Sequence, residues 1–229
     1  MEAGRRRRTG SGEEERRERK REDKGGDGID TEAHMVCWNH TLVGKVCVAQ
    51  GKEYRAKDAT SAFVWPAARP LCRVICESGA VRGKTVCELG CGPGLPGIVA
   101  AKAGATRVVL LDKPTDLALA RRNVEWNMCA DTVDVRGCVW GDADALEKIG
   151  VFDVVLVSDC VYAQEPEECA LLIESMKKLC RADGGKILMA YQFRENLLAD
   201  SAFFDMAHDV FKACICSEIE GVWIFDWRR

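Results

Sequence analysis

The segment 86–97, VCELGCGPGLPG, places an acidic residue next to a loop that contains four glycines within eight positions. Such a loop between a strand and a helix is typical of nucleotide and cofactor sites, because glycine lets a ligand approach the backbone closely. Gly92 to Gly97 satisfies the GxGxxG spacing of dinucleotide sites, and Asp112 follows 20 residues after Gly92. A P-loop is excluded because no Gly-Lys-Ser/Thr follows.

Glu88 distinguishes the candidate cofactors, because it lies two positions before Gly90 at the end of the apolar strand segment. A pyrophosphate against this loop would be repelled by the carboxylate. S-adenosylmethionine has no phosphate and carries a sulfonium and an ammonium, which a carboxylate attracts. Asp112 ends the next strand segment, where it can accept hydrogen bonds from both ribose hydroxyls. We therefore expect S-adenosylmethionine; a nicotinamide dinucleotide and a ligand-free turn with a surface acid are the alternatives.

Asp159 and Tyr162 lie three residues apart, directly after the apolar segment VVLVS. Ligands of open α/β sheets bind beyond the carboxyl ends of central strands, so both side chains are candidates for one pocket. Methyl transfer to an amine chiefly requires that a neutral nucleophile be positioned in line. We expect Asp159 to orient an incoming ammonium and Tyr162 to line the acceptor channel. A nearby carboxylate stabilises the charged ammonium, so deprotonation needs a further cause. The alternative role of Asp159 is a helix or turn cap.

These residues require a scaffold that brings several strand ends together. From Thr85 the chain alternates segments typical of strands with segments typical of helices. We expect strands at 85–90, 107–112, 131–140, 152–159 and 184–192, and helices at 95–105, 114–127, 165–180 and 195–211. A short connection joins strands at 212–219 and 221–227, which predicts an antiparallel hairpin. Upstream, 35–54 alternates like a β-hairpin and 66–80 resembles a helix. The expected fold is a doubly wound α/β sheet, mostly parallel and seven-stranded.

Length and composition limit the domain organisation. With 229 residues, 47% of them hydrophobic, the chain is long enough for one substantial core and too short for two comfortable domains. Residues 1–28 hold ten basic and eight acidic residues and almost no apolar ones, so we expect a disordered charged tail. Residues 29–229 then form a single domain, with an accessory hairpin at about 35–55.

Charge, hydropathy and cysteine spacing exclude several classes of function. No apolar run approaches the roughly 20 residues of a membrane span, so we expect no membrane partner. Outside the tail, 23 basic and 28 acidic residues remain, which disfavours nucleic-acid binding except through the tail. The thirteen cysteines form no CxxC pair and lack zinc-site spacing, so we expect no metal and reduced, mostly buried thiols. We expect a cytoplasmic monomer, with the nucleus as a further location. Alternating Glu and Arg follow the arginines at 5–8, which favours a solvated tail, with a nuclear import signal or nucleic-acid patch as the alternative.

Several motifs together resemble a known family. ELGCGPGLPGIVAA, VVLLDK, VWGD and SDCVY occur in the order and rough spacing of the seven-strand S-adenosylmethionine-dependent methyltransferases. With FVWPAARPLC upstream, the chain resembles the DxxY-type protein-lysine methyltransferases over roughly residues 35–229. The resemblance implies methyl transfer to a nitrogen of a protein substrate, expected to be a lysine side chain. Arginine, histidine, an N-terminal amine or a small molecule as acceptor, and a non-catalytic cofactor-binding interaction protein, are the alternatives.

The resemblance also implies roles for individual residues. Trp65 packs near the methionine end of the cofactor, and Trp140 lies by the adenine, with core packing as the alternative for both. Asp112 binds the ribose, and Ser158 lines the pocket at the end of the fourth strand. The backbone of the loop is supplied by Gly90, Cys91 and Gly92. The chain departs from the family pattern at Cys91 and Pro93, where Ala and Thr are frequent, and at 163–164, where Ala-Gln follows Tyr162.

Overall fold

The computed structural model describes residues 35–51, 60–161, 165–193 and 197–229. Residues 34–229 form one compact unit. The expected tail at 1–28 and the candidate residue Tyr162 lie outside the described residues, so the domain boundaries stay predictions. Within the described part, no helix is long and apolar enough to cross a membrane.

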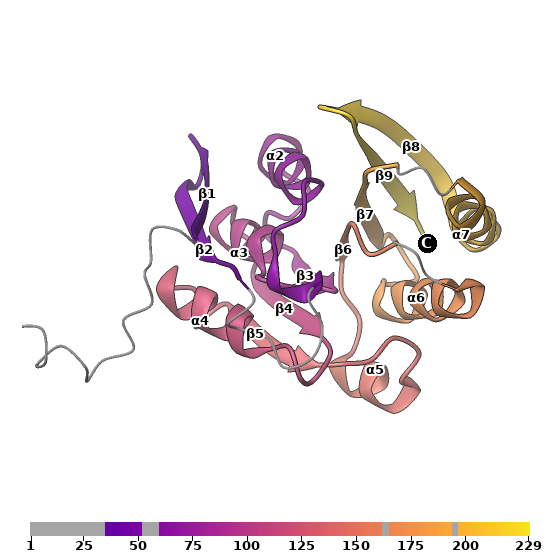
Figure 1. Ribbon diagram of the computed structural model, residues 1–229, viewed down its shortest axis with the longest axis horizontal. Coiled ribbons are helices and arrows are strands. Elements are labelled where there is room, and N and C mark those ends of the chain that lie inside the picture. Colours follow the sequence, from indigo (N-terminus) through magenta and orange to yellow (C-terminus); the bar gives the residue numbers. More distant parts are fainter. Residues whose placement is uncertain (1–34, 52–59, 162–164, 194–196) are drawn as a thin grey trace, which may run out of the picture. The chain divides into compact units, whose positions relative to one another are not determined.

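A seven-stranded sheet with the order β5-β4-β3-β6-β7-β9-β8 forms the centre of this unit (Figure 1). Its strands are β3 (Thr85–Leu89), β4 (Arg107–Asp112), β5 (Val133–Gly137), β6 (Val154–Ser158), β7 (Lys186–Tyr191), β8 (Lys212–Ile219) and β9 (Val222–Arg228). The first five run parallel, whereas β9 pairs antiparallel with both β7 and β8. The expected mostly parallel sheet with a C-terminal antiparallel hairpin is confirmed.

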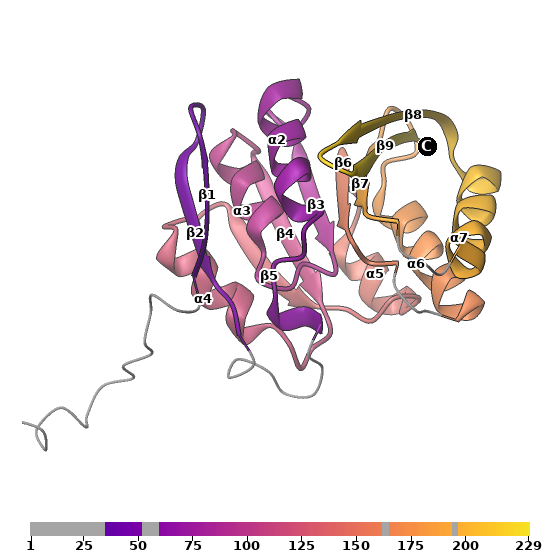
Figure 2. The ribbon, with the colours of Figure 1, turned by 45° about the horizontal axis from the view of Figure 1, so that its top comes forward.

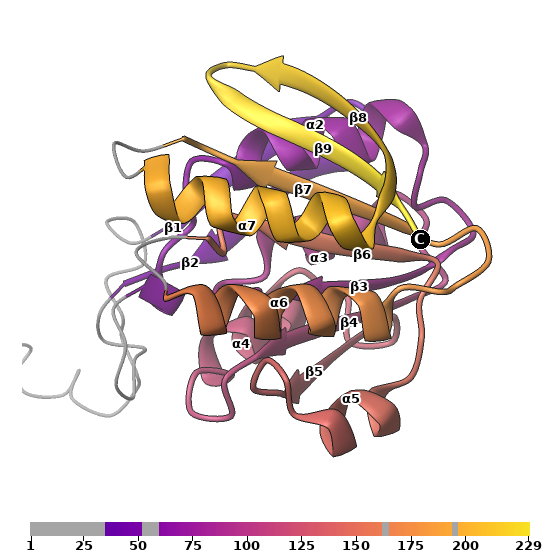
Figure 3. The same ribbon diagram turned by 90° about the vertical axis from the view of Figure 1, so that its right-hand side faces the viewer.

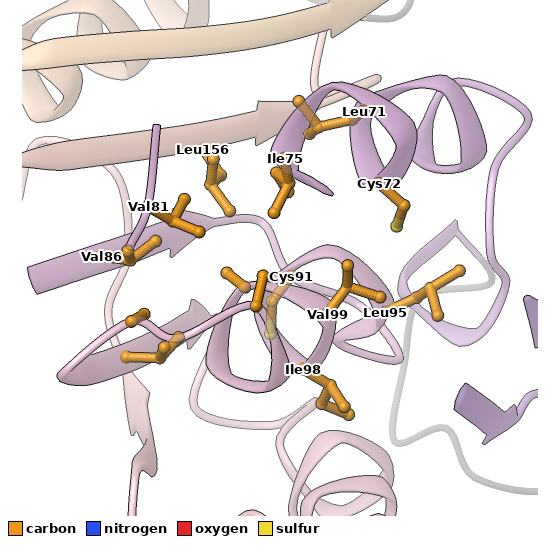
Figure 4. Packing of buried hydrophobic residues seen from close by; sticks show 14 of the residues in the cluster. Leu71, Cys72, Ile75, Val81, Val86, Cys91, Leu95, Ile98, Val99 and Leu156 are labelled. Atoms are coloured by element: carbon orange, nitrogen blue, oxygen red, sulfur yellow. The ribbon is translucent and has the colours of Figure 1, made fainter. Parts of the chain in front are cut away.

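Helices cover both faces of the sheet. One layer contains α2 (Ala68–Ser78), α3 (Leu95–Lys102) and α4 (Ala118–Trp126), and the other contains α5 (Ala143–Ile149), α6 (Pro166–Leu179) and α7 (Leu197–Val210) (Figure 3). Alternate residues of a strand face opposite layers, so Leu156 packs in the first core and Val155 in the second. This two-sided burial explains the continuous apolar runs of β4 and β6. Figure 4 shows Leu71 and Ile75 of α2 facing the side of the sheet on which α3 packs.

Helix α5 was not expected from the sequence, because it is short and follows a segment typical of a strand. The expected strand at 131–140 ends at Gly137 in the structure. Asp142 then caps α5, since its carboxylate accepts a hydrogen bond from the Ala145 amide at 3.1 Å. The cap is a local signal that identifies the helix start once the strand is known to be shorter.

The N-terminal hairpin pairs β1 (Met35–His40) with β2 (Gly44–Ala49) in a separate two-stranded sheet (Figure 2). Its register places Cys37 opposite Cys47 with their Cα atoms 4.1 Å apart, and a disulfide joins them. The expectation of reduced thiols is therefore wrong for this pair. It rested on the absence of CxxC spacing, whereas cross-strand pairing brings cysteines ten residues apart into contact. Nine other described cysteines are free and buried, as expected.

Asn123 of α4 attaches this hairpin to the domain and to the glycine loop. Its buried side chain accepts a hydrogen bond from the Ala49 amide at 2.8 Å. Its amide group donates to the carbonyls of Ala49 and Pro93 at 3.1 and 2.9 Å. One turn later, Asn127 donates to the Cys47 carbonyl at 2.7 Å. The hairpin and the loop that follows β3 are thus held by the same side chain.

We expect Asn123→Ala to lower the free energy of unfolding by at least about 2 kcal/mol, because a buried backbone group left without its partner costs about 1 to 3 kcal/mol. Urea unfolding followed by circular dichroism measures the loss. Asn39→Ala, on the exposed part of β1, is the matched control and should change stability by less than about 0.5 kcal/mol. Equal losses in the two variants would remove this role from Asn123.

Candidate active site

A cavity of about 250 Å³ lies at the carboxyl ends of the parallel strands. From β3 the chain adds β4 and β5 on one side and then β6 and β7 on the other, and the cavity lies at this switch point, the usual ligand site of an open α/β sheet. The structure brings nine of the residues singled out from the sequence to its wall: Trp65, Glu88, Gly90, Cys91, Gly92, Asp112, Trp140, Ser158 and Asp159. That they bind a cofactor or substrate stays a prediction.

The glycine loop is fixed by its backbone conformation and by close packing. Gly90, Gly92 and Gly94 have φ angles of 64°, 50° and 83°, a region that L side chains rarely adopt. A Cβ atom on Gly90 would lie 2.7 Å from the Cys160 sulfur. The loop therefore exposes backbone to the cavity on one side and packs against Cys160, two residues beyond the end of β6, on the other, which leaves no room for a larger residue at position 90.

Glu88 is buried beneath the loop and also lines the cavity. Its Oε2 accepts a hydrogen bond of 2.8 Å from the Gly97 amide, which lies in the first turn of α3. Burial raises the pKa of this carboxyl to about 8, while the Gly97 hydrogen bond opposes the rise. At neutral pH this carboxyl is therefore mostly protonated. A cation that enters the cavity favours the charged form and lowers this pKa.

Asp112 holds the other side of the loop. Its two carboxylate oxygens accept hydrogen bonds from the Gly92 amide at 2.7 Å and from the Lys113 amide at 2.8 Å. Burial raises its pKa to about 6, and the two backbone hydrogen bonds oppose the rise. Each oxygen keeps a second lone pair for a hydroxyl donor. The residue predicted to bind ribose thus also orders the loop.

Asp159 follows β6 in a left-handed backbone conformation, with φ 55°. Its amide donates to the Ala190 carbonyl at 2.9 Å, and its Oδ1 accepts from the Gln192 amide at 3.5 Å. The side chain therefore sits where β6 and β7 end side by side. This position agrees with a role toward an acceptor group, and the N-cap residue of the next helix, α6, is Glu165 and not Asp159.

The two tryptophans differ in their surroundings. Trp65 is 39% exposed, and its indole nitrogen donates to the Thr60 carbonyl at 2.9 Å. Trp140 is half-buried, and its ring lies 3.6 Å from where a Cβ on Gly90 would be. Neither is a fully buried core residue, and both face the cavity.

The charge of the cavity is acidic. Glu88, Asp112 and Asp159 line the cavity. Two further acids, Asp116 after β4 and Glu168 of α6, also line it and were not identified from the sequence. Lys113 is the only lysine or arginine among the described lining residues. Asp116 lies four residues after Asp112, and this proximity was a signal for it, whereas Glu168 reaches the site only through the packing of α6 on the sheet. Such a cavity favours a cationic ligand over an anionic one. The described residues contain no cluster of side chains that could hold a metal ion.

Comparison with known proteins decides the family. The family described as lysine methyltransferase matches residues 50–210. This chain belongs to the lysine methyltransferase family. A protein-lysine methyltransferase METTL21E of Mus musculus is 34% identical over 165 residues, which cover 68% of this chain and 65% of that protein. A protein N-lysine methyltransferase METTL21A of Xenopus tropicalis is 38% identical over 109 residues, which cover 46% and 49%.

A third relative, a protein N-terminal and lysine N-methyltransferase EFM7 of Yarrowia lipolytica, is 35% identical over 155 residues, which cover 56% of this chain and 55% of that protein. The chain spans about half to two thirds of the length of the curated relatives that it matches. Among solved structures, the fold matches an rRNA methyltransferase (RsmC) of T. thermophilus with a TM-score of 0.61 and 15% identity, over 86% of this chain and 51% of that one. The methyltransferase fold expected from the sequence is confirmed.

Close packing at Gly97 provides a test of the loop geometry. In an unobstructed helix, replacing glycine with alanine stabilises by about 1 kcal/mol. A Cβ on Gly97 would instead collide with the Leu110 side chain and lie 2.8 Å from Glu88 Oε2. We expect Gly97→Ala to be destabilising, by about 1 to 3 kcal/mol of overpacking. Thermal unfolding measures the change, and a melting temperature above that of the unaltered protein would contradict the packing described.

Proposed function

We propose that this protein transfers a methyl group from S-adenosylmethionine to a nitrogen of a protein substrate, a lysine side chain. The buried carboxyl of Glu88 under the glycine loop carries the proposal, because its charged form, which a bound cation favours, pairs with the cationic methionine end of this cofactor and repels a phosphate. Membership of the lysine methyltransferase family supports the acceptor, and the structural neighbour RsmC is described in complex with AdoMet.

The residues around the cavity fit the parts of this cofactor. Asp112 retains acceptor capacity for the ribose hydroxyls while it orders the loop. Trp140 offers a ring for the adenine, and Trp65 closes the methionine end from the segment before α2. Glu88 compensates the charge of the ammonium and the sulfonium. When bound, S-adenosylmethionine supplies a methyl group that is already activated for displacement, so the protein chiefly has to position the acceptor.

Asp159 is the residue we assign to the acceptor. It stands at the end of β6 on the cavity wall, and its Oδ1 is oriented by the Gln192 amide. A carboxylate there attracts a lysine ammonium and points it toward the cofactor. Loss of the ammonium proton is assisted by desolvation and by the sulfonium charge, since both lower the lysine pKa. Tyr162, two residues after Cys160, is assigned to the wall of the acceptor channel.

An N-terminal amine is the second candidate acceptor. The EFM7 relative from Yarrowia lipolytica is named for both N-terminal and lysine methylation. The two acceptors are amines of similar size, and an acidic cavity attracts both when they are protonated. Mass spectrometry of methylated substrate proteins distinguishes them by the position of the added methyl group.

Cofactor binding should release protons at pH 7. The buried Glu88 carboxyl has a pKa of about 8, so it is mostly protonated at pH 7 and loses its proton when the cation binds. Affinity for S-adenosylmethionine should therefore rise between pH 6 and 8. Titration calorimetry in phosphate and in Tris, which differ in ionisation enthalpy, measures the proton release. The Glu88→Gln variant keeps an acceptor for the Gly97 amide, and it should lose most of the proton release. If the heat of binding to the unaltered protein is the same in both buffers, the assignment is contradicted.

Methyl transfer should depend on the charge of Asp159. We expect Asp159→Asn to lower the rate 10- to 1,000-fold, equivalent to about 1.4 to 4 kcal/mol, with little change in cofactor affinity. Asparagine tolerates the left-handed conformation, so the backbone is preserved. Transfer of tritiated methyl groups to proteins of a cell lysate measures the rate. Asp183→Asn, an exposed site, is the matched control. If Asp159→Asn abolishes cofactor binding instead, the acceptor is misplaced.

A further inference from the structure

A second groove, of about 420 Å³, lies beyond the end of β7. It shares no described lining residue with the cofactor cavity. Aromatic side chains of β9, α7 and the residues after β7 form much of its wall, notably Phe193, Phe204 and Trp223. Two aspartates of α7, Asp200 and Asp205, line it as well. Neither the proposed methyl transfer nor the cofactor uses any of these residues.

Phe193 and Trp223 are large, adjacent and exposed, at 41% and 37%. Their ring centroids are 5.9 Å apart and their planes are nearly perpendicular, at 87°. Phe204 lies behind Phe193 at 5.6 Å and continues into the buried aromatic core through Phe225 at 4.8 Å. The core therefore holds the two exposed rings in place at right angles. The two rings meet edge to face, and the ring surface that they leave exposed attracts a cation.

The groove is also acidic. Asp205 is exposed on α7, and Asp200 is buried beside it and accepts a hydrogen bond from the Tyr191 hydroxyl. Glu218 of β8 is paired with Trp223 across the strands, so both side chains stand on the same face of the sheet. His208 lines the groove, and no lysine or arginine occurs among its described lining residues. An apolar occupant would gain nothing from the negative charge of these carboxylates, whereas a cation is attracted by both the rings and the acids.

The groove lies next to the acceptor side of the active site. The Gln192 amide contacts Asp159, and Phe193 is the next residue. Tyr191 pairs with Trp223, so the start of β9 lies at the same sheet edge as the end of β7. In Figure 3 the end of β7, the start of α7 and the β8–β9 connection lie together at the left end of the sheet. Along this edge the cofactor cavity, Asp159 and the groove therefore follow one another.

We propose that this groove binds the cationic side chain of a lysine or arginine that lies near the methylated residue in the substrate protein. The proposal rests on the proposed function and specifies its substrate: a basic segment, with one amine at Asp159 and a second cation against the exposed rings of Phe193 and Trp223. The groove then selects substrates by the charge of a residue near the methylated one.

Direct binding tests the groove without any need for catalysis. The full-length protein is labelled with 5-fluorotryptophan, and the Trp223 resonance is assigned with Trp223→Phe. N-acetyl-lysine methylamide, its arginine analogue and the uncharged norleucine analogue are titrated with S-adenosylhomocysteine present at saturation. We expect a saturable shift of the Trp223 resonance with lysine, arginine or both, and at least threefold weaker binding of norleucine. The resonance of Trp126, exposed on α4, should not move. Equal binding of norleucine, or no shift, would overturn the proposal.

Charge variants and activity complete the test. Asp205→Asn should weaken cation binding at least threefold, whereas Asp209→Asn, exposed on the same helix, should not. With peptides that carry one acceptor lysine and one variable neighbour, Trp223→Ala should raise the KM of peptides with a basic neighbour about 5- to 50-fold and leave cofactor affinity unchanged. Cation binding without methylation of any peptide or lysate protein would contradict the proposed function; methylation without preference for basic neighbours would contradict only the groove.

Discussion

The hydrogen bond between the Glu88 carboxyl and the Gly97 amide is the contact on which the site depends. It joins the end of β3 to the first turn of α3 and so sets the path of the glycine loop between them. Asp112 fixes the same loop from β4 through Gly92, and Asn123 fixes it from α4 through Pro93. Two buried acids are costly for the fold unless they are hydrogen-bonded. The protein uses them both to hold the backbone and to make the cavity acidic.

The parallel sheet arranges charge along one edge. The carboxyl ends of β4, β3 and β6 bring Asp112, Glu88 and Asp159 to one cavity, and the end of β7 extends the edge to the aromatic groove. A cationic cofactor and a cationic substrate meet along such an edge only if the carboxylates offset their mutual repulsion. The acidic lining of both hollows agrees with the proposed methyl transfer to an amine, in which both reactants begin with positive charge.

Local sequence predicted the features that depend on neighbouring residues, and failed where tertiary pairing decides. The glycine loop, Glu88 and Asp112 were recognisable because their spacing reflects one strand–loop–helix unit. The Cys37–Cys47 disulfide required the hairpin register, which the alternating pattern did not specify. The groove was not foreseen because Phe193 and Trp223 are thirty residues apart and meet only through the antiparallel pairing of β9 with β7.

Backbone amide shifts of the glycine loop test most directly the claim that this loop holds the methyl donor and not a dinucleotide. With glycine-selective ¹⁵N labelling, the chain's 21 glycines give a spectrum simple enough to assign by substitution. S-adenosylhomocysteine should shift the amides of Gly90, Gly92 and Gly97, and should leave those of Gly150 and Gly221 in place. NAD at the same concentration should shift none of them. Equal shifts with NAD, or shifts with S-adenosylhomocysteine that spare the loop, would contradict the account.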